Sequence, residues 1–132
     1  MSTNKRIPEI ICSGFQVPEL GKFSFSVNYR GTRRSAILIR FKGVVYGYLN
    51  QCVHMPKRLD CEHSHIFDES GQYLQCSMHK ICYEPTSGES ISEICAGKKL
   101  TALKVTEAGG MVYLMEKRST AVDFVDKRNT HG

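Results

Sequence analysis

The sequence has no apolar run approaching the roughly 18 residues that a membrane-spanning helix needs, although 41% of its 132 residues are hydrophobic. Its first residues also lack the continuous apolar segment of a secretory signal, because Met1 to Arg6 is polar and Pro8 follows closely. These absences predict a soluble protein in the cytoplasm with no membrane partner.

A paired nucleophile and base and a phosphate-binding glycine loop are also absent, which argues against a hydrolase. The formal net charge is +5, but the Lys and Arg residues are spread over several segments and form no single basic stripe. We therefore predict no nucleic-acid partner and no enzymatic activity of the chain itself. A solvated basic surface, or a docking face for an acidic protein, fits this charge pattern better.

Short alternating segments predict one all-β domain over residues 8–116, followed by a charged and mobile tail over residues 117–132. Phe23, Phe25 and Val27 alternate with small or polar residues, so they are expected to share the buried face of a strand. The turns Arg30-Gly31-Thr32-Arg33, Lys42-Gly43 and Glu107-Ala108-Gly109-Gly110 separate the predicted strands, which are residues 22–27, 35–41, 44–49, 72–75, 100–105 and 111–115.

The periodic pattern fades between Asn50 and Gly97, where five of the six cysteines and four of the five histidines lie. Two short motifs stand out: Cys52-Val53-His54, and Cys76-Ser77-Met78-His79 after the 21 residues from Met55 to Gln75. Thiolate and imidazole ligands suit both zinc and ferric iron. Zinc fingers usually keep two Cys in one motif and two His in the other, whereas each motif here mixes one Cys with one His.

Mixed motifs of this kind are what a Rieske cluster requires, because two Cys bind one iron and two His bind the other. The sequence resembles the Rieske ferredoxins over about Phe15 to Met115, and the resemblance extends beyond the four candidate ligands. The family pattern also has a leucine five residues after the first His, an aromatic residue four after the second and a glycine nine after it. These positions are Leu59, Tyr83 and Gly88, and a third loop is matched by Cys95-Ala96-Gly97 and Leu100.

The resemblance implies three small antiparallel sheets with a cluster-binding subdomain inserted, and one 2Fe-2S cluster held by Cys52, His54, Cys76 and His79. A second Cys-x-His motif, Cys61-Glu62-His63, offers another register, and neither register has the usual family spacing to Cys76. Cys52 and His54 are preferred because they follow a predicted strand directly and place Leu59 correctly. Lys80 and Pro56 stand where the family often has glycine.

The function implied by the resemblance is single-electron relay from a flavin-dependent reductase to a terminal oxygenase or a related oxidoreductase. Two alternatives stay open at this point. One is a Rieske-type small subunit of a larger oxidoreductase, such as a nitrite reductase. The other is a structural zinc-binding interaction domain, because the same thiol and imidazole ligands also suit zinc.

Overall fold

The computed structural model describes residues 9–53, 57–60, 65–76, 81–92, 97–115 and 119–121, with β10 described by its backbone alone. These residues form strands and one short 3-10 helix, η1 (Gly14–Gln16). Among them, no helix has the length and apolar character needed to cross a membrane. The strands are β1 (Glu9–Ser13), β2 (Lys22–Tyr29), β3 (Thr32–Phe41), β4 (Val44–Leu49), β5 (Leu74–Gln75), β6 (Cys82–Tyr83), β7 (Ala102–Leu103), β8 (Val105–Ala108), β9 (Met111–Leu114) and β10 (Ser119–Ala121).

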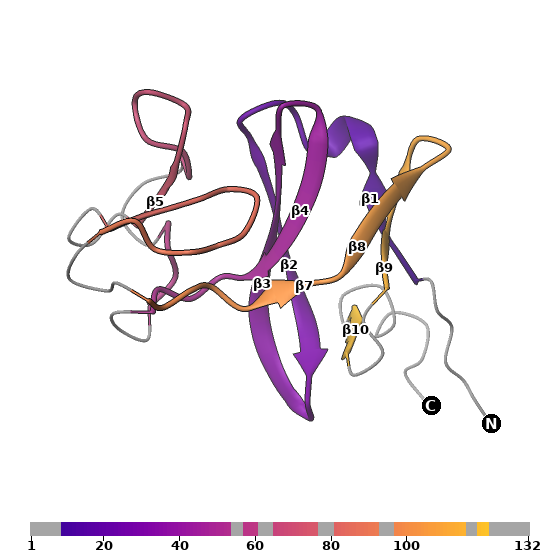
Figure 1. The fold of residues 1–132 in the computed structure, drawn as a ribbon. Helices are drawn as coiled ribbons and strands as arrows, with labels where there is room; N and C mark the ends of the chain where they lie inside the picture. The colour runs from indigo at the N-terminus through magenta and orange to yellow at the C-terminus, as the bar shows by residue number, and fades with distance from the viewer. Residues whose placement is uncertain are drawn as a thin grey trace.

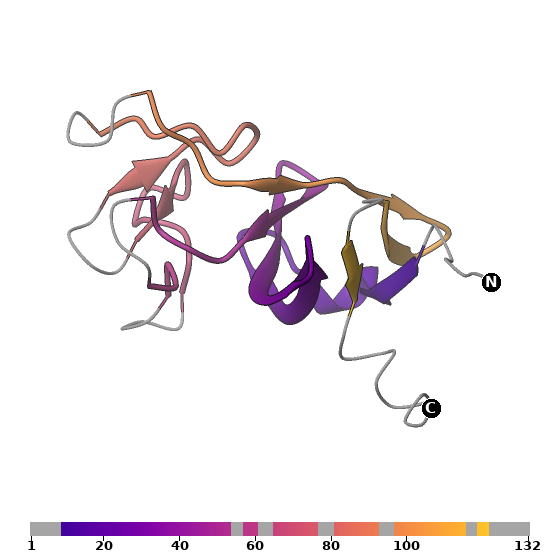
Figure 2. The same ribbon diagram turned by 90° about the horizontal axis from the view of Figure 1, so that it is seen from below.

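The strands form three antiparallel sheets, which confirms the predicted fold class. The largest sheet has the order β10-β2-β3-β4-β7, a second has the order β1-β9-β8, and β5 pairs with β6 in the third. Figures 1 and 2 show the loops that follow β4 gathered at one end of the molecule and β1, β8 and β9 at the other, with β2, β3 and β4 between them.

Two tight hairpins build the centre of the large sheet. Tyr29 pairs with Thr32 across the first turn, and Phe41 pairs with Val44 across the second. Both central residues of each turn have positive φ: 51° and 82° at Arg30 and Gly31, and the same values at Lys42 and Gly43. Such two-residue turns match the right-handed twist of the flanking strands, so the predicted turns are confirmed.

The side chains of β3 pack alternately into two separate hydrophobic cores, because successive residues of a strand point to opposite faces. Ala36 and Leu38 belong to the first, which we call the body core and which also holds the predicted Phe25 and Val27. Ile37 and Ile39 belong to the second, which we call the loop core. The loop core also contains Tyr48, Cys52, Leu59, Ile66, Phe67, Leu74, Cys76, Ile81, Tyr83 and Leu100.

The predicted strand 100–105 is wrong in one respect, because the chain changes sheets at Lys104. Leu103 pairs with Gly47 of β4, whereas Val105 pairs with Leu114 of β9. Val105 crosses over Gly47, where an added Cβ would lie 2.9 Å from the Val105 Cγ1 atom. The missing side chain at Gly47 thus gives Val105 room to leave one sheet and join the other.

Three strands, β1, β6 and β10, have no counterpart among the predicted strands. β1 pairs with β9, and the β10 backbone pairs with β2 from Ser119↔Tyr29 to Ala121↔Val27. β10 therefore lies inside the predicted tail and extends the large sheet. The domain limits of residues 8–116 and 117–132 stay a prediction.

Candidate metal centre

Two loops of the same construction carry the predicted cysteines. Cys52 follows β4, and its N–H donates to the carbonyl of Lys57 at 2.9 Å; Cys76 follows β5, and its N–H donates to the carbonyl of Ile81 at 2.8 Å. Each cysteine therefore opens a loop that is closed by a backbone hydrogen bond to the residue five positions later. Cys52 is 2% exposed and Cys76 is fully buried. His54 and His79 fall within these two loops but lie outside the described residues.

Tyr83 connects the second loop to the first. Its side chain is fully buried, and its hydroxyl oxygen lies 3.2 Å from the Val53 nitrogen and 3.3 Å from Cys52 Sγ. Since the oxygen accepts the Val53 N–H, the phenol proton is available to the sulfur. Burial, followed by the contact with Cys52, raises the pKa of Tyr83 above its ordinary value, with smaller electrostatic contributions from Cys52 and Cys76. The hydroxyl thus keeps its proton and acts as a donor beside the thiols.

A buried polar network fixes the far side of the first loop. Asn50 is 3% exposed; its Oδ1 accepts the Leu59 N–H at 2.8 Å, and its Nδ2 donates to Asp60 Oδ1 at 3.1 Å. Asp60 also forms a salt bridge with Lys22 at the start of β2. Hydrogen bonds from Lys22 and Asn50 lower the pKa of Asp60 even though burial acts in the opposite direction. Sequence reasoning missed this network, although it singled out Leu59 from the family pattern, and Leu59 is fully buried here.

The remaining cysteines have no assigned chemistry. Cys12 lies in the body core, where burial, followed by the charge of Glu107, raises the pKa of its thiol to about 11. Cys82 is half-buried on β6, with Gln75 Nε2 at 3.7 Å from its sulfur. Neither forms a disulfide bond in the described part of the chain. The competing motif Cys61-Glu62-His63 and Cys95 lie outside the described residues.

Comparison with known proteins identifies the family of this arrangement. The Rieske [2Fe-2S] domain family matches residues 11–107, which is more than half of the chain. The chain belongs to the Rieske [2Fe-2S] domain family. Its cofactor is therefore one 2Fe-2S cluster. No curated protein matches the chain.

Solved Rieske structures share the fold. The ferredoxin of carbazole 1,9a-dioxygenase from Nocardioides aromaticivorans IC177 superimposes with a TM-score of 0.68 and 20% identity, over 85% of this chain and 100% of that chain. A chain in a complex of reduced oxygenase and oxidized ferredoxin in carbazole 1,9a-dioxygenase gives 0.67 and 18%, over 86% and 97% of the two chains. A longer chain in the reduced complex between oxygenase and ferredoxin gives 0.65 and 18%, over 80% of this chain and 27% of that one.

The described residues fit a Rieske cluster. Thiolate sulfur is the ligand that iron–sulfur clusters use, and Cys52 and Cys76 lie in the same loop core. Hydrogen bonds to sulfur and low solvent exposure are the levers by which a protein tunes such a cluster. Tyr83 supplies a hydrogen bond to sulfur, and the burial of both cysteines supplies the low solvent exposure.

Gly88, the glycine of the family pattern, lies against Tyr48 and Leu100 of the loop core. Its φ is +79°, and an added Cβ would lie 2.8 Å from Tyr48 Cε1. Gly88→Ala should therefore lower the free energy of unfolding by about 1–3 kcal/mol, through both backbone strain and the clash. Gly31→Ala is the matched control, because Gly31 has a φ of +82° with nothing within 4 Å of the added Cβ. If urea titrations gave the same decrease in the free energy of unfolding for both variants, the clash with Tyr48 would not contribute to the loss of stability at Gly88.

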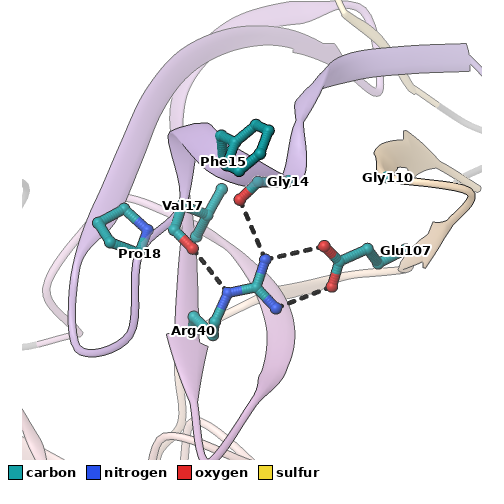
Figure 3. Close-up of a pocket in the computed structure, with 7 residues that line it drawn as sticks. All are labelled: Gly14, Phe15, Val17, Pro18, Arg40, Glu107 and Gly110. Carbon is teal, nitrogen blue, oxygen red and sulfur yellow. Dashed lines mark hydrogen bonds and ion pairs between the residues drawn. The ribbon is translucent and has the colours of Figure 1, made fainter.

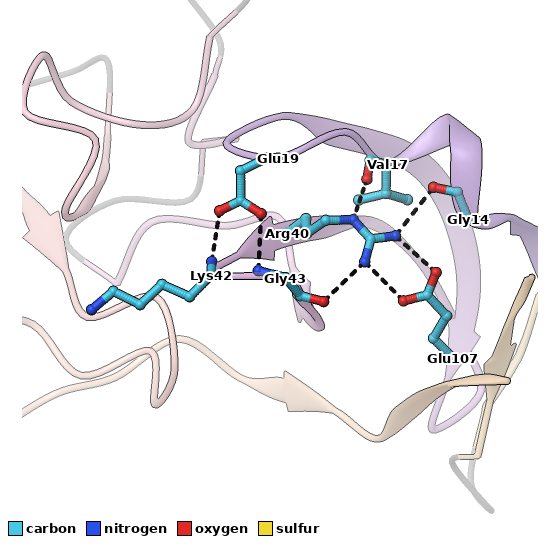
Figure 4. A network of polar contacts seen from close by, with 7 residues as sticks. All are labelled: Gly14, Val17, Glu19, Arg40, Lys42, Gly43 and Glu107. Atoms are coloured by element: carbon cyan, nitrogen blue, oxygen red, sulfur yellow. Dashed lines mark hydrogen bonds and ion pairs between the residues drawn. The ribbon is translucent and has the colours of Figure 1, made fainter.

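A separate depression of about 440 Å³ lies between η1, β3 and the β8–β9 turn (Figure 3). Its floor is Arg40, whose guanidinium uses all five N–H donors within the chain (Figure 4). It binds the carboxylate of Glu107 through two bonds of 2.8 Å and also donates to the carbonyls of Gly14, Val17 and Gly43. Phe15 at the rim is 94% exposed. With its donors satisfied, Arg40 holds three segments of the chain together.

Proposed function

We propose that this chain is a one-electron carrier whose cluster is bound by Cys52 and Cys76 on one iron and by His54 and His79 on the other. The observation that supports this most directly is the pair of equivalent loops, each opened by a buried cysteine and each containing one of the histidines. The cluster supplies reversible one-electron chemistry when bound. The chain itself supplies ligation, exclusion of water and the Tyr83 hydroxyl.

The proposed partners are a flavin-dependent reductase as donor and a terminal oxygenase or related oxidoreductase as acceptor. The solved neighbours support the acceptor class, because they include complexes of ferredoxin with the oxygenase of carbazole 1,9a-dioxygenase. Electron relay requires no substrate site on the carrier, so the proposed chain is a component of an oxidoreductase system and is not a complete enzyme.

Electron paramagnetic resonance of the anaerobically purified, dithionite-reduced protein tests the proposal. We expect a signal with the lower average g value that distinguishes mixed His and Cys ligation from all-cysteine clusters. Cys52→Ser and Cys76→Ser should each lose the cluster, whereas Cys12→Ser, a cysteine of the body core, should retain it. Loss of the cluster in Cys61→Ser with retention in Cys52→Ser would select the competing register. If the purified protein were colourless and contained one zinc ion, the electron-transfer proposal would be wrong and the site would have a structural role.

Tyr83→Phe should lower the reduction potential by about 40–60 mV, because a hydrogen bond of roughly 1 kcal/mol corresponds to about 40 mV for one electron. The bond from the hydroxyl to Cys52 Sγ is stronger when the cluster carries the extra electron, so its loss disfavours reduction. Protein-film voltammetry provides the measurement. Tyr46→Phe is the control, since Tyr46 packs against the same core from β4. An unchanged potential in Tyr83→Phe would show that the hydroxyl does not donate to a cluster ligand.

A further inference from the structure

The stretch from Leu20 to Leu59 contains no Asp or Glu but carries eight basic residues. At least three of them lie against carboxylates: Lys22 and Arg58 face Asp60, and Arg40 binds Glu107. Arg30 and Arg34 instead contact neutral groups: Arg30 lies over the Tyr29 ring at 5.5 Å, and Arg34 donates to the Gln51 amide at 2.5 Å. The full set is Lys22, Arg30, Arg33, Arg34, Arg40, Lys42, Lys57 and Arg58.

Two of these basic residues are attached to the immediate surroundings of Cys52. Arg34 of β3 bonds to the side chain of Gln51, which directly precedes Cys52. Lys57 is exposed, and its carbonyl accepts the Cys52 N–H at 2.9 Å. Two basic residues that are 23 positions apart in the sequence (57 minus 34) are therefore both attached to the chain around a proposed cluster ligand, Arg34 through its side chain and Lys57 through its backbone.

No acidic residue opposes this charge from the strands that pair with the β2–β3 hairpin. β4 (Val44–Leu49) flanks β3 and the backbone of β10 (Ser119–Ala121) flanks β2, and neither strand contains Asp or Glu. Asp60 is the first acid after Cys52, but its side chain is 8% exposed and is bound to Lys22. Within the part of the chain that the structure describes, the strands that flank the hairpin thus supply no carboxylate to Arg30 or Arg34.

We propose that Arg34 and Lys57, with Arg30 at the hairpin turn, form the surface on which an acidic face of a redox partner docks. This inference rests on the proposed function. The adjacency to Cys52 favours a protein partner, because a docked protein must bring its own redox centre near the cluster. Charge complementarity of this kind raises the association rate and selects the orientation of the encounter.

Charged small oxidants test the surface through stopped-flow oxidation of the reduced cluster. Hexacyanoferrate(III) takes one electron from the cluster and becomes hexacyanoferrate(II); tris(phenanthroline)cobalt(III) takes one electron and becomes the cobalt(II) complex. We expect added salt to slow the anionic oxidant and to accelerate the cationic one. Arg34→Gln and Lys57→Gln should each slow hexacyanoferrate about two-fold at an ionic strength of about 0.1 M, where the Debye length is about 10 Å.

Two further variants separate charge from structure. Arg34→Lys keeps the charge and should retain the wild-type rate. Lys42→Gln is the matched control, because Lys42 follows the opposite end of β3, eight residues from Arg34 (42 minus 34), or roughly 26 Å along an extended strand. An equal slowing in Lys42→Gln and Arg34→Gln, or the opposite salt dependence in the wild type, would overturn the inference while leaving the electron-transfer function intact.

A competitor identifies the class of partner. A polyglutamate peptide should slow hexacyanoferrate oxidation of the wild type and have little effect on the Arg34→Gln/Lys57→Gln double variant. Stronger competition by a single-stranded oligodeoxythymidine than by polyglutamate would replace the acidic protein with a nucleic acid and overturn the proposal. A wild-type protein without a reducible cluster would refute the proposed function and this inference together.

Discussion

Arg40→Met should lower the free energy of unfolding by about 2–4 kcal/mol, because one partly buried guanidinium satisfies acceptors on three separate segments. Its side chain is 15% exposed, and it donates to the carbonyls of Gly14 and Val17 and to the carboxylate of Glu107. Methionine keeps most of the aliphatic volume but leaves these oxygens without their donor. Lysine carries a single ammonium group and cannot make the several hydrogen bonds of the planar guanidinium. Arg40→Lys should therefore recover only part of the lost stability.

Urea titration followed by circular dichroism checks this prediction, with Arg58→Met as the control. Arg58 is 60% exposed and lies 3.9 Å from Asp60, so its removal should change stability by less than about 1 kcal/mol. A double-mutant cycle with Glu107→Gln isolates the ion pair from the three carbonyl contacts. If Arg40→Met were as stable as Arg58→Met, the guanidinium would not be holding the segments together.

The same pair predicts a pH dependence of known sign. The hydrogen bond from Arg40 lowers the pKa of Glu107 from 4.5. The stability that ionised Glu107 contributes is therefore complete above the pKa of Glu107 in the unfolded state. It is lost as the pH falls through the lower pKa of the folded state. The difference in stability between wild type and Arg40→Met should narrow below about pH 4 and stay constant between about pH 6 and 8. If the difference in stability between wild type and Arg40→Met increased on acidification, the Arg40–Glu107 ion pair would not be the cause of the lowered pKa.

Asn50→Ala should have the second large effect, a loss of about 2–4 kcal/mol in stability together with a reduced yield of cluster-loaded protein. The substitution leaves the Leu59 N–H and Asp60 Oδ1 without a bond in a buried setting, and each unsatisfied group costs roughly 1–3 kcal/mol. The iron content per chain and the urea midpoint provide the two readouts.

Asn28→Ala is the matched control for the Asn50 prediction, because Asn28 is exposed on β2. It should leave both the iron content and the unfolding midpoint close to wild type. Asp60→Asn is the second variant: it keeps the shape but removes the charge that faces Lys22. Full iron content in Asn50→Ala would show that the first loop closes without this network.

The sequence was sufficient to predict features that depend on local patterning. The β2–β3 and β3–β4 turns follow from an Arg-Gly and a Lys-Gly pair between alternating segments, and both adopt the positive φ values that such turns require. Leu59, Tyr83 and Gly88 were taken from a family pattern, and all three are buried in or against the loop core. The local signals and the tertiary structure agree at these positions.

Features that depend on partners far away in the chain were not predicted. Arg40 and Glu107 are 67 residues apart, and Lys22 and Asp60 are 38 apart, so no local pattern pairs them. β1 depends on pairing with β9, and the break at Lys104 depends on the room above Gly47. The identity of the iron ligands remains a prediction, since His54 and His79 lie outside the described residues.

The separation of the two cores bears on how the protein acquires its iron. Cys52 and Cys76 are buried in the loop core, so a donor of iron and sulfide cannot reach their sulfur atoms while that core is closed. The body core shares only the large sheet with it and contains neither cysteine. Loading of iron into the folded chain would therefore need the loops to open as a local unit, whereas β1, β8 and β9 lie outside the loop core and could stay packed.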